Sequence, residues 1–295
     1  MENLRLKLFN EREKRIHPHK DDKIITDWNG LMIAALSQAG QVFKNEKYLD
    51  AARDAANFII KKMFIDNRLM HRYRDGDANI TGNLDDYSFL IWGLLELYSS
   101  IFDIKYLKTA INLNKILIDH LWDNTNGGFY FTSDETIKVL IREKKTFDSA
   151  TPSGNSVEIL NLLRIARITE NPELESMAIK MEETFSNNIK RSLAGHTHFI
   201  NAINYKIGPA YEIVIVGKPQ DKNTIKILNS IKEHYIPNMV LVFKDPDNAG
   251  DLDNISESMK FKTIINNQTT VYICSSGSCK RPTTDINEML KILEQ

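Results

Sequence analysis

Three clusters of polar and aromatic residues stand directly before long apolar helix patterns, and they hold the best candidates for chemistry in this chain. They are residues 26–30 (Thr-Asp-Trp-Asn-Gly), 83–87 (Asn-Leu-Asp-Asp-Tyr) and 150–156 (Ala-Thr-Pro-Ser-Gly-Asn-Ser). A second, more charged helix pattern follows each apolar one, so the clusters occupy the same place in a repeating unit. We therefore expect the three polar helix starts to converge, and any chemistry to lie where they meet.

Capping explains one polar residue at each helix start. Asp, Asn and Ser accept hydrogen bonds from the free N–H groups of a first helical turn and suit the positive end of the helix dipole. Capping does not explain a second carboxylate beside Asp86, nor the rings of Trp28 and Tyr87. Aromatic faces beside carboxylates and amides are typical of sugar pockets. The predicted substrate-binding residues are Asp27, Trp28, Asn29, Tyr87, Arg142, Ser153 and Asn155.

Carboxylates are the first candidates for acid–base catalysis. Hydrolysis of a glycosidic bond needs two carboxyl groups about 5–9.5 Å apart on opposite sides of that bond. Neighbours on one helix point about 100° apart, so Asp85 or Asp86 would pair with Asp22, Asp27 or Asp148 of another hairpin. An epimerase instead places a base and an acid, often histidines, on either side of a sugar carbon. The predicted catalytic residues are Asp85, Asp86 and Asp148; the histidines His17, His19 and His71 are candidates by residue type alone.

The role of the segment before the third cluster allows two interpretations. Arg142 there can bind a carboxylate, phosphate or sugar oxygen of a ligand. Arg142 and Asp148 can equally pair with each other and hold the loop in place. The sequence leaves both readings open.

The two cysteines, Cys274 and Cys279, are the redox candidates. Two ligands do not make a structural zinc site, which takes four, and a thioredoxin-type pair has two intervening residues where this pair has four. A disulfide closing the short loop is geometrically allowed. We expect two reduced cysteines near a strand end. We find no dinucleotide or phosphate-binding glycine motif, and we expect no cofactor and no metal.

Composition is that of an ordinary soluble globular protein. The chain has 295 residues, 42% hydrophobic and 26% charged, with a formal net charge of −1. A charge so close to zero argues against nucleic acid or an anionic membrane as the main partner. No apolar run approaches the roughly 20 residues of a membrane helix. The start lacks the apolar stretch of a secretory signal, and two cysteines fit a reducing compartment, so we expect a cytoplasmic protein.

Apolar periodicity predicts three helical hairpins and then a different architecture. The hairpin helices are expected over 28–44 and 47–63, 85–101 and 104–121, and 154–169 and 172–189, with short strand segments at 68–73 and 127–131. Strands expected at 211–217, 239–243 and 270–274 alternate with helices at 221–234 and 284–293, which indicates a small, partly parallel α/β unit. Residues 245–262 are expected to be loop-rich and mobile. We divide the chain into a helical domain, 1–205, and a small α/β unit packed on it, 206–295.

Several motifs resemble one family, in the same order along nearly the whole chain. They are residues 17–35, the Leu-Asp-Asp-Tyr of 84–87, residues 150–156 and the late segment 271–282 with its two cysteines and a proline. Together they are similar to the thioredoxin-domain-containing family that includes spermatogenesis-associated protein 20. That family joins a thioredoxin-like domain to an (α/α)6 barrel similar to six-hairpin glycosidases and N-acylglucosamine 2-epimerases. The resemblance covers only the C-terminal half or so, since we see no thioredoxin-type motif near the start and only three hairpins.

The resemblance implies a mostly α fold, namely an α/α toroid portion of about three hairpins followed by the small α/β unit. It also implies a carbohydrate-active-like barrel, with a sugar epimerase or glycosidase-like activity on a sugar-like ligand. The first alternative is a non-catalytic scaffold half that assembles with a separate N-terminal thioredoxin/half-barrel chain. The second is a thiol redox role through Cys274 and Cys279.

Overall fold

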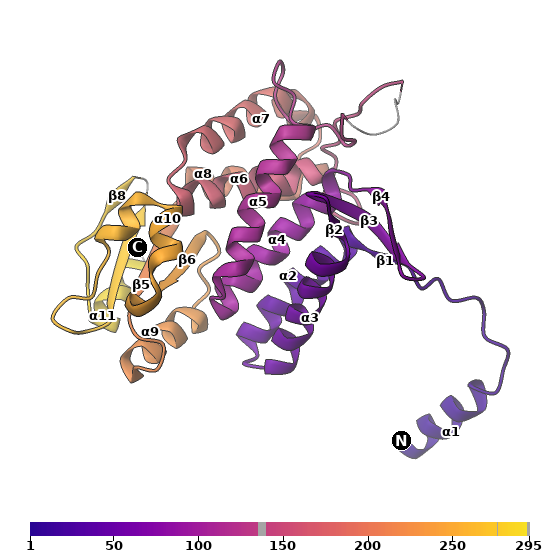
Figure 1. Cartoon of the computed structure of the whole chain (residues 1–295), viewed down its shortest axis with the longest axis horizontal. Coiled ribbons are helices and arrows are strands. Elements are labelled where there is room, and N and C mark those ends of the chain that lie inside the picture. Colours follow the sequence, from indigo (N-terminus) through magenta and orange to yellow (C-terminus); the bar gives the residue numbers. More distant parts are fainter. Residues whose placement is uncertain (135–139, 276, 294–295) are drawn as a thin grey trace.

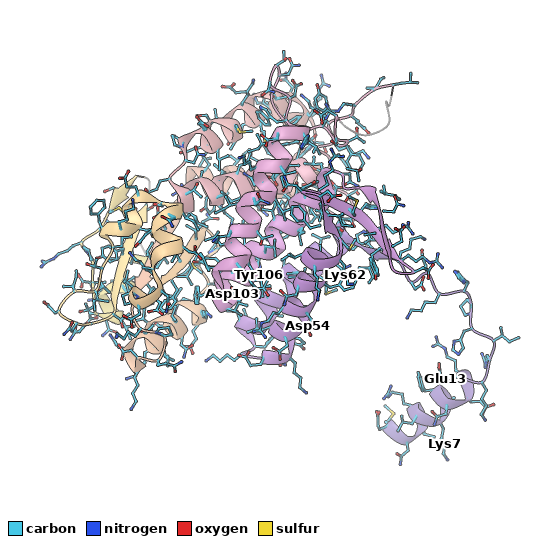
Figure 2. All side chains as sticks on the ribbon, in the orientation of Figure 1. Lys7, Glu13, Asp54, Lys62, Asp103 and Tyr106 are labelled. Atoms are coloured by element: carbon cyan, nitrogen blue, oxygen red, sulfur yellow. A yellow bond between two sulfur atoms is a disulfide. The ribbon has the colours of Figure 1, made fainter. Side chains whose placement is uncertain are left out.

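The helical part of the chain forms three antiparallel hairpins, as its periodicity predicts. A computed structural model describes residues 1–134, 140–275 and 277–293 (Figure 1). A short helix, α1 (Glu2–Arg12), buries none of its residues. Lys7 of this helix and Glu13, which directly follows it, lie away from the rest of the molecule (Figure 2). The hairpins are α2 (Thr26–Val42) with α3 (Glu46–Lys62), α4 (Leu84–Ile101) with α5 (Ile104–Leu121), and α6 (Gly154–Thr169) with α7 (Pro172–Arg191).

A further helix, α8 (Thr197–Ile207), packs beside α6 and was not predicted from the sequence. Its buried residues Phe199, Ala202 and Tyr205 lie on one face. Helices α2, α4, α6 and α8 pack side by side as an inner layer, and α3, α5 and α7 each pack on the inner helix that precedes them. This is an arc of an α/α toroid, in which every inner helix begins at the same end.

Two glycines let α2 and α4 approach closely. A Cβ added to Gly30 would lie 2.5 Å from the carbonyl carbon of Phe89, and one added to Gly93 would lie 2.6 Å from the carbonyl oxygen of Gly30. Real Cβ atoms do not come so near to backbone, so both positions require glycine. The close crossing brings the start of α2 against the start of α4, where the first two polar clusters lie.

A small antiparallel sheet borders these helix starts. Its central strand, β3 (Arg68–Arg74), confirms the strand predicted at 68–73, and β1 (Ile24–Ile25), β2 (Phe64–Ile65) and β4 (Asp77–Thr81) pair with it. The strand segment predicted at 127–131 is reduced to an isolated bridge between Trp122 and Phe129.

The C-terminal part is a partly parallel sheet with helices, as predicted. Strand β5 (Tyr211–Val216) pairs in parallel with β6 (Met239–Lys244) and antiparallel with β7 (Thr270–Ser275), which continues into β8 (Ser278–Cys279). Alternation divides β5 between two cores: Ile213 and Ile215 face α9 (Lys222–Glu233) and α11 (Ile286–Leu293), whereas Val214 and Val216 join the core of the helical part. The sheet therefore packs directly on the hairpins; the boundary at residues 205/206 stays a prediction.

The expectation that residues 245–262 are loop-rich is wrong. They form α10 (Gly250–Ile255) between two short 3-10 helices, η2 (Pro246–Asn248) and η3 (Glu257–Phe261). Leu252 and Met259 are buried in the main core, and these two anchors hold the polar segment against the sheet. Across the described residues, no helix is long and apolar enough to cross a membrane.

Candidate active site

The starts of α2, α4 and α6 meet, as the repeat of polar clusters predicts. The backbone N–H of Asp27 on α2 donates to Oδ1 of Asp86 on α4, 3.1 Å away. The backbone N–H of Gly154 on α6 donates to the Asp85 carboxylate, and a Cβ on Gly154 would lie 2.5 Å from Oδ1 of Asp85. Two adjacent carboxylates of α4 thus each bind the first turn of a different neighbouring helix.

Asp86 is the fully buried centre of the cluster. Its Oδ2 accepts from the backbone N–H of Asn83 at 2.8 Å, which completes a capping box at the start of α4. Both carboxylate oxygens also lie within 3.0 Å of Nδ1 of His71. Because an ionised carboxylate only accepts hydrogen bonds, Nδ1 carries the hydrogen of this contact.

Two hydrogen bonds anchor β3 just before His71. Just before it, the Thr26 hydroxyl donates to the carbonyl of Met70 at 2.6 Å, and the backbone N–H of Leu69 donates to the Tyr87 hydroxyl at 3.0 Å. The imidazole is 26% exposed, so it can meet a ligand. The hydrogen bond to Asp86 is the main cause that raises the pKa of His71 above its ordinary value.

Burial raises the pKa of two further carboxyl groups beside this dyad. The pKa of Asp85 rises to about 6, chiefly through burial and further through the charges of Asp27 and Asp86, against the Gly154 N–H and Lys145, which lower it. The pKa of Asp27 also rises, first through burial and then through the charge of Asp86. Groups with pKa values displaced toward neutrality are typical of acid–base catalysis.

The arrangement suits proton transfer better than metal binding. One ligand atom each from Asp27, His71 and Asp86 lies within 4.8 Å of the others, a spacing that a cation can bridge. Each Asp86 oxygen, however, already accepts a backbone N–H, and Nδ1 of His71 points at the same carboxylate. At neutral pH Asp85 is mostly ionised, while Asp86 favours the imidazolium form of His71. The cluster therefore contains a carboxylate that can act as a base and an imidazole whose protonated form the neighbouring Asp86 favours.

Several of the predicted ligand-binding residues hold the structure together instead. The Asn29 amide donates to the carbonyl of Ile25, the Tyr87 ring is buried, and Ser153 caps α6 by accepting from the N–H of Ser156. Asn155, fully buried, binds the backbone N–H and carbonyl of Phe129 and the carbonyl of Lys145, all at 2.9 Å. Asp27 lies in the cluster itself, and Trp28, which follows it, has a side chain that is 67% exposed.

Asp148 and Arg142 also have structural partners, and the structure does not pair them with each other among the described residues. The Asp148 oxygens accept the backbone N–H groups of Ser153 at 2.9 Å and His198 at 2.8 Å, which joins the starts of α6 and α8. Arg142 donates to the carbonyls of Thr132 and His120, and its guanidinium lies over the Tyr130 ring. The loop is held, but by two separate sets of bonds. The other predicted histidines, His17 and His19, lie exposed on the segment after α1, away from the cluster.

Sequence reasoning undervalued His71 and missed Lys145 and Glu158. Glu158 is completely buried one turn into α6, where burial raises its pKa to about 8. Its signal was a lone acidic residue inside the apolar run Val157-Glu158-Ile159. No sequence pattern indicated Lys145, because its charge acts on Asp85 only through the path that the loop before α6 takes.

The expectation of two reduced cysteines is wrong in this structure. Cys274 and Cys279 form a disulfide between the facing strands β7 and β8. The structure has the alternative state, in which a disulfide closes the loop between the two cysteines.

Comparison with known proteins confirms the family resemblance and the fold. Spermatogenesis-associated protein 20 of Rattus norvegicus is 31% identical over 98% of this chain, and an uncharacterized protein of Caenorhabditis elegans is 30% identical over 98%. The chain spans 38% and 40% of the lengths of these two relatives. No protein-family model matches the chain.

Solved structures share the helical architecture. A GH76 α-mannanase of Bacteroides thetaiotaomicron superposes with a TM-score of 0.51 at 16% identity, over 73% of this chain and 58% of the other. A cellobiose 2-epimerase from Bacillus thermoamylovorans gives a TM-score of 0.49 at 15% identity, over 95% of this chain and 78% of the other. At 16% identity the likeness to the mannanase concerns the fold alone, which is that of the α/α toroid.

Proposed function

Because this chain is a relative of spermatogenesis-associated protein 20 with an α/α toroid fold, we propose that it is the acid–base portion of a sugar-processing protein. The observation that supports the proposal most is the cluster of Asp27, His71, Asp85 and Asp86 where three inner helix starts meet. Such a cluster can donate a proton to one side of a sugar and accept a proton from the other side, as an epimerase or a glycosidase requires.

Each residue has a distinct role in the proposed mechanism. Asp86 orients His71 through Nδ1 and favours its protonated form, so Nε2–H donates a proton to a sugar oxygen. Asp85, ionised above about pH 6, accepts a proton from a sugar carbon or from an attacking water. Asp27 keeps the Asp85 pKa high by its charge, and the exposed ring of Trp28 stacks on a sugar face.

The test is a panel of reducing mono- and disaccharides incubated with the intact chain in D2O and followed by proton NMR. An epimerase exchanges the hydrogen beside the sugar carbonyl for deuterium, whereas a glycosidase releases new reducing ends without that exchange. We expect one of these signals, lost at least 100-fold in His71→Gln and in Asp85→Asn, since general acid–base groups contribute about 10²–10⁴. Asp54→Asn, an exposed carboxylate of α3, is the matched control and should keep full activity.

A second observation favours assembly with another chain. On α2 the side chains of Trp28, Met32, Ala35, Ala39 and Val42 follow one another at spacings of four and three, which is the stripe of a helix that packs on a neighbour. Trp28, Met32 and Val42 are 67%, 56% and 66% exposed. We call these five residues the α2 stripe. Contiguous apolar surface of this kind marks an interface.

We propose that the α2 stripe receives an inner helix of a further hairpin, supplied by a separate half-barrel chain. The curated relatives extend well beyond the matched stretch, since the chain spans 38% of the rat protein, and that additional length can supply such hairpins. In this second candidate function the chain is a scaffold half, whether or not the assembled barrel is catalytic.

The partner proposal is tested by light scattering and by mixing with the rest of the rat relative, expressed separately. We expect a one-to-one complex that is lost in the double variant Met32→Glu, Val42→Glu. Ile225→Glu, on α9 and 44% exposed, is the control and should bind normally. A chain that stays monomeric and does not bind, or a complex that the stripe variant forms equally well, would contradict the proposal.

A further inference from the structure

A cleft of about 890 Å³ lies where α6, α7 and α8 meet the C-terminal sheet. Its walls come from the end of α6, the start of α7, η3 and β7, and they include the Cys274–Cys279 disulfide. The cleft lies at the far end of α6 from the acid–base cluster, since Arg167 is about 20 Å along that helix from Gly154. It is therefore a separate site, large enough for a small organic ligand.

In the described part of the cleft, Arg167 has no carboxylate oxygen within ion-pair distance, and its charge acts on the Glu212 carboxyl group only from farther away. Lys206 pairs with Glu182 at 2.7 Å, and Lys262 lies 3.6 Å from Glu212. The Arg167 guanidinium lies over the Tyr205 ring, 5.2 Å from its centroid. A stacked guanidinium with free donors is suited to a carboxylate of a ligand.

The two sulfur positions differ in accessibility. Cys274 is 9% exposed, whereas Cys279 lies on the exposed strand β8 at the rim of the cleft. Cys279 is the more exposed of the two residues and is the expected point of attack, with the Cys274 sulfur as the leaving group. Thiol–disulfide exchange depends on such access and on which sulfur is attacked.

We propose that this cleft binds a small thiol that carries a carboxylate, through Arg167, and exchanges it with the Cys274–Cys279 disulfide. The thiol loses its proton to solvent, and its thiolate attacks Sγ of Cys279. A new sulfur–sulfur bond forms to the ligand, the Cys274–Cys279 bond breaks, and the electron pair leaves on Sγ of Cys274, which takes a proton from water. Attack by a second thiolate then releases the ligand disulfide and leaves both cysteines reduced, so two thiols supply the two electrons.

The test compares 3-mercaptopropionate, which has a carboxylate, with 2-mercaptoethanol, which has none. The intact chain is incubated with each thiol, quenched by alkylation, and the mixed disulfide plus the reduced dithiol are measured by mass spectrometry. In Arg167→Ala we expect the rate with 3-mercaptopropionate to fall about 10-fold, the value of one charged hydrogen bond, and the rate with 2-mercaptoethanol to stay unchanged. Dividing the rate of the variant by the rate of the natural chain, for each thiol separately, removes the intrinsic reactivity of that thiol.

Two further variants make the result decisive. Arg191→Ala, an exposed arginine at the end of α7, should leave both rates unchanged, and Arg167→Lys should recover part of the selectivity. Peptide mapping should place the trapped adduct on Cys279. Equal losses for both thiols in Arg167→Ala, an adduct on Cys274, or no reaction with either thiol would overturn the proposal.

Discussion

Glu158 provides the sharpest test of the structure, because a fully buried carboxyl group couples folding to pH. It lies between α6 and α4, where its Oε2 accepts from the Asn161 amide at 3.0 Å. Oε1 of Glu158 and Oδ1 of Asn161 are buried without a well-formed hydrogen bond, and the buried Ser88 hydroxyl lies close enough to Glu158 to act as a donor to it. A proton on Glu158 supplies a donor to this group of acceptors. Burial is the main cause that raises the pKa of Glu158 from its ordinary 4.5 to about 8.

The raised pKa of Glu158 determines both the sign and the size of the pH dependence that this residue gives to stability. The unfolded chain releases the Glu158 proton near pH 4.5 and the folded chain only near pH 8, so the contribution of Glu158 to the free energy of unfolding is most favourable below pH 4.5 and falls until pH 8. One pKa unit corresponds to about 1.36 kcal/mol. The contribution of Glu158 to the free energy of unfolding is therefore lower by about 3 kcal/mol at pH 7 and by about 5 kcal/mol above pH 8. Removing the ionisable group should remove this loss.

Glu158→Gln is the matched substitution, since its amide has nearly the same shape as the protonated carboxyl group. We expect urea unfolding to give equal stabilities for the variant and the natural chain near pH 4. At pH 7 the variant should be more stable by about 3 kcal/mol. Glu257→Gln, on the exposed side of η3, should show no such pH-dependent difference. A stability difference that stays constant between pH 4 and pH 8 would refute the assignment of Glu158 as a buried, protonated group.

Three further outcomes are expected. Gly30→Ala should destabilise the chain by about 3 kcal/mol in urea unfolding, because its Cβ would overlap the α4 backbone; Gly250→Ala, with open space around it, should not. Asn155→Ala should cost about 3 kcal/mol and loosen the loop before α6 in hydrogen exchange, since three buried backbone groups lose their partner; unchanged protection of Phe129 would contradict this. The proposed sugar activity should rise with pH through about 6 as Asp85 ionises and fall as His71 loses its proton, and the acid limb should disappear in Asp85→Asn.

The sequence predicted the hairpins well because their apolar residues recur at helical spacing. The strands of the C-terminal sheet were equally clear, since β5 and β7 are short runs of Val, Ile and Tyr. Helix α8 was missed because it buries only Phe199, Ala202 and Tyr205 and is flanked by polar residues. Segment 245–262 was misread because Leu252 and Met259 anchor it through contacts that are distant in sequence.

The sequence predicted where the candidate site lies better than it predicted which residues form it. Polar clusters before helices indicated where the inner helices begin, and Asp85 and Asp86 are both in the cluster that formed. His71 belongs to it because β3 crosses beside α4, and no local pattern encodes that crossing. Asp148 and Asn155 have the same residue types as catalytic and binding groups. Only the three-dimensional structure shows that backbone groups occupy their oxygens and amides.

The α2 stripe and the acid–base cluster adjoin each other at the start of α2, where Trp28 lies. It begins the α2 stripe and directly follows Asp27, whose carboxylate accepts the Trp28 N–H at 2.6 Å. A helix that covers the stripe would also cover the start of α2 and remove water from Asp27 and Asp85. Further burial raises carboxyl pKa values, so assembly should move the acid limb of the sugar activity to a pH above 6. A pH profile of the isolated chain that stays the same after complex formation would show that the partner and the site are independent.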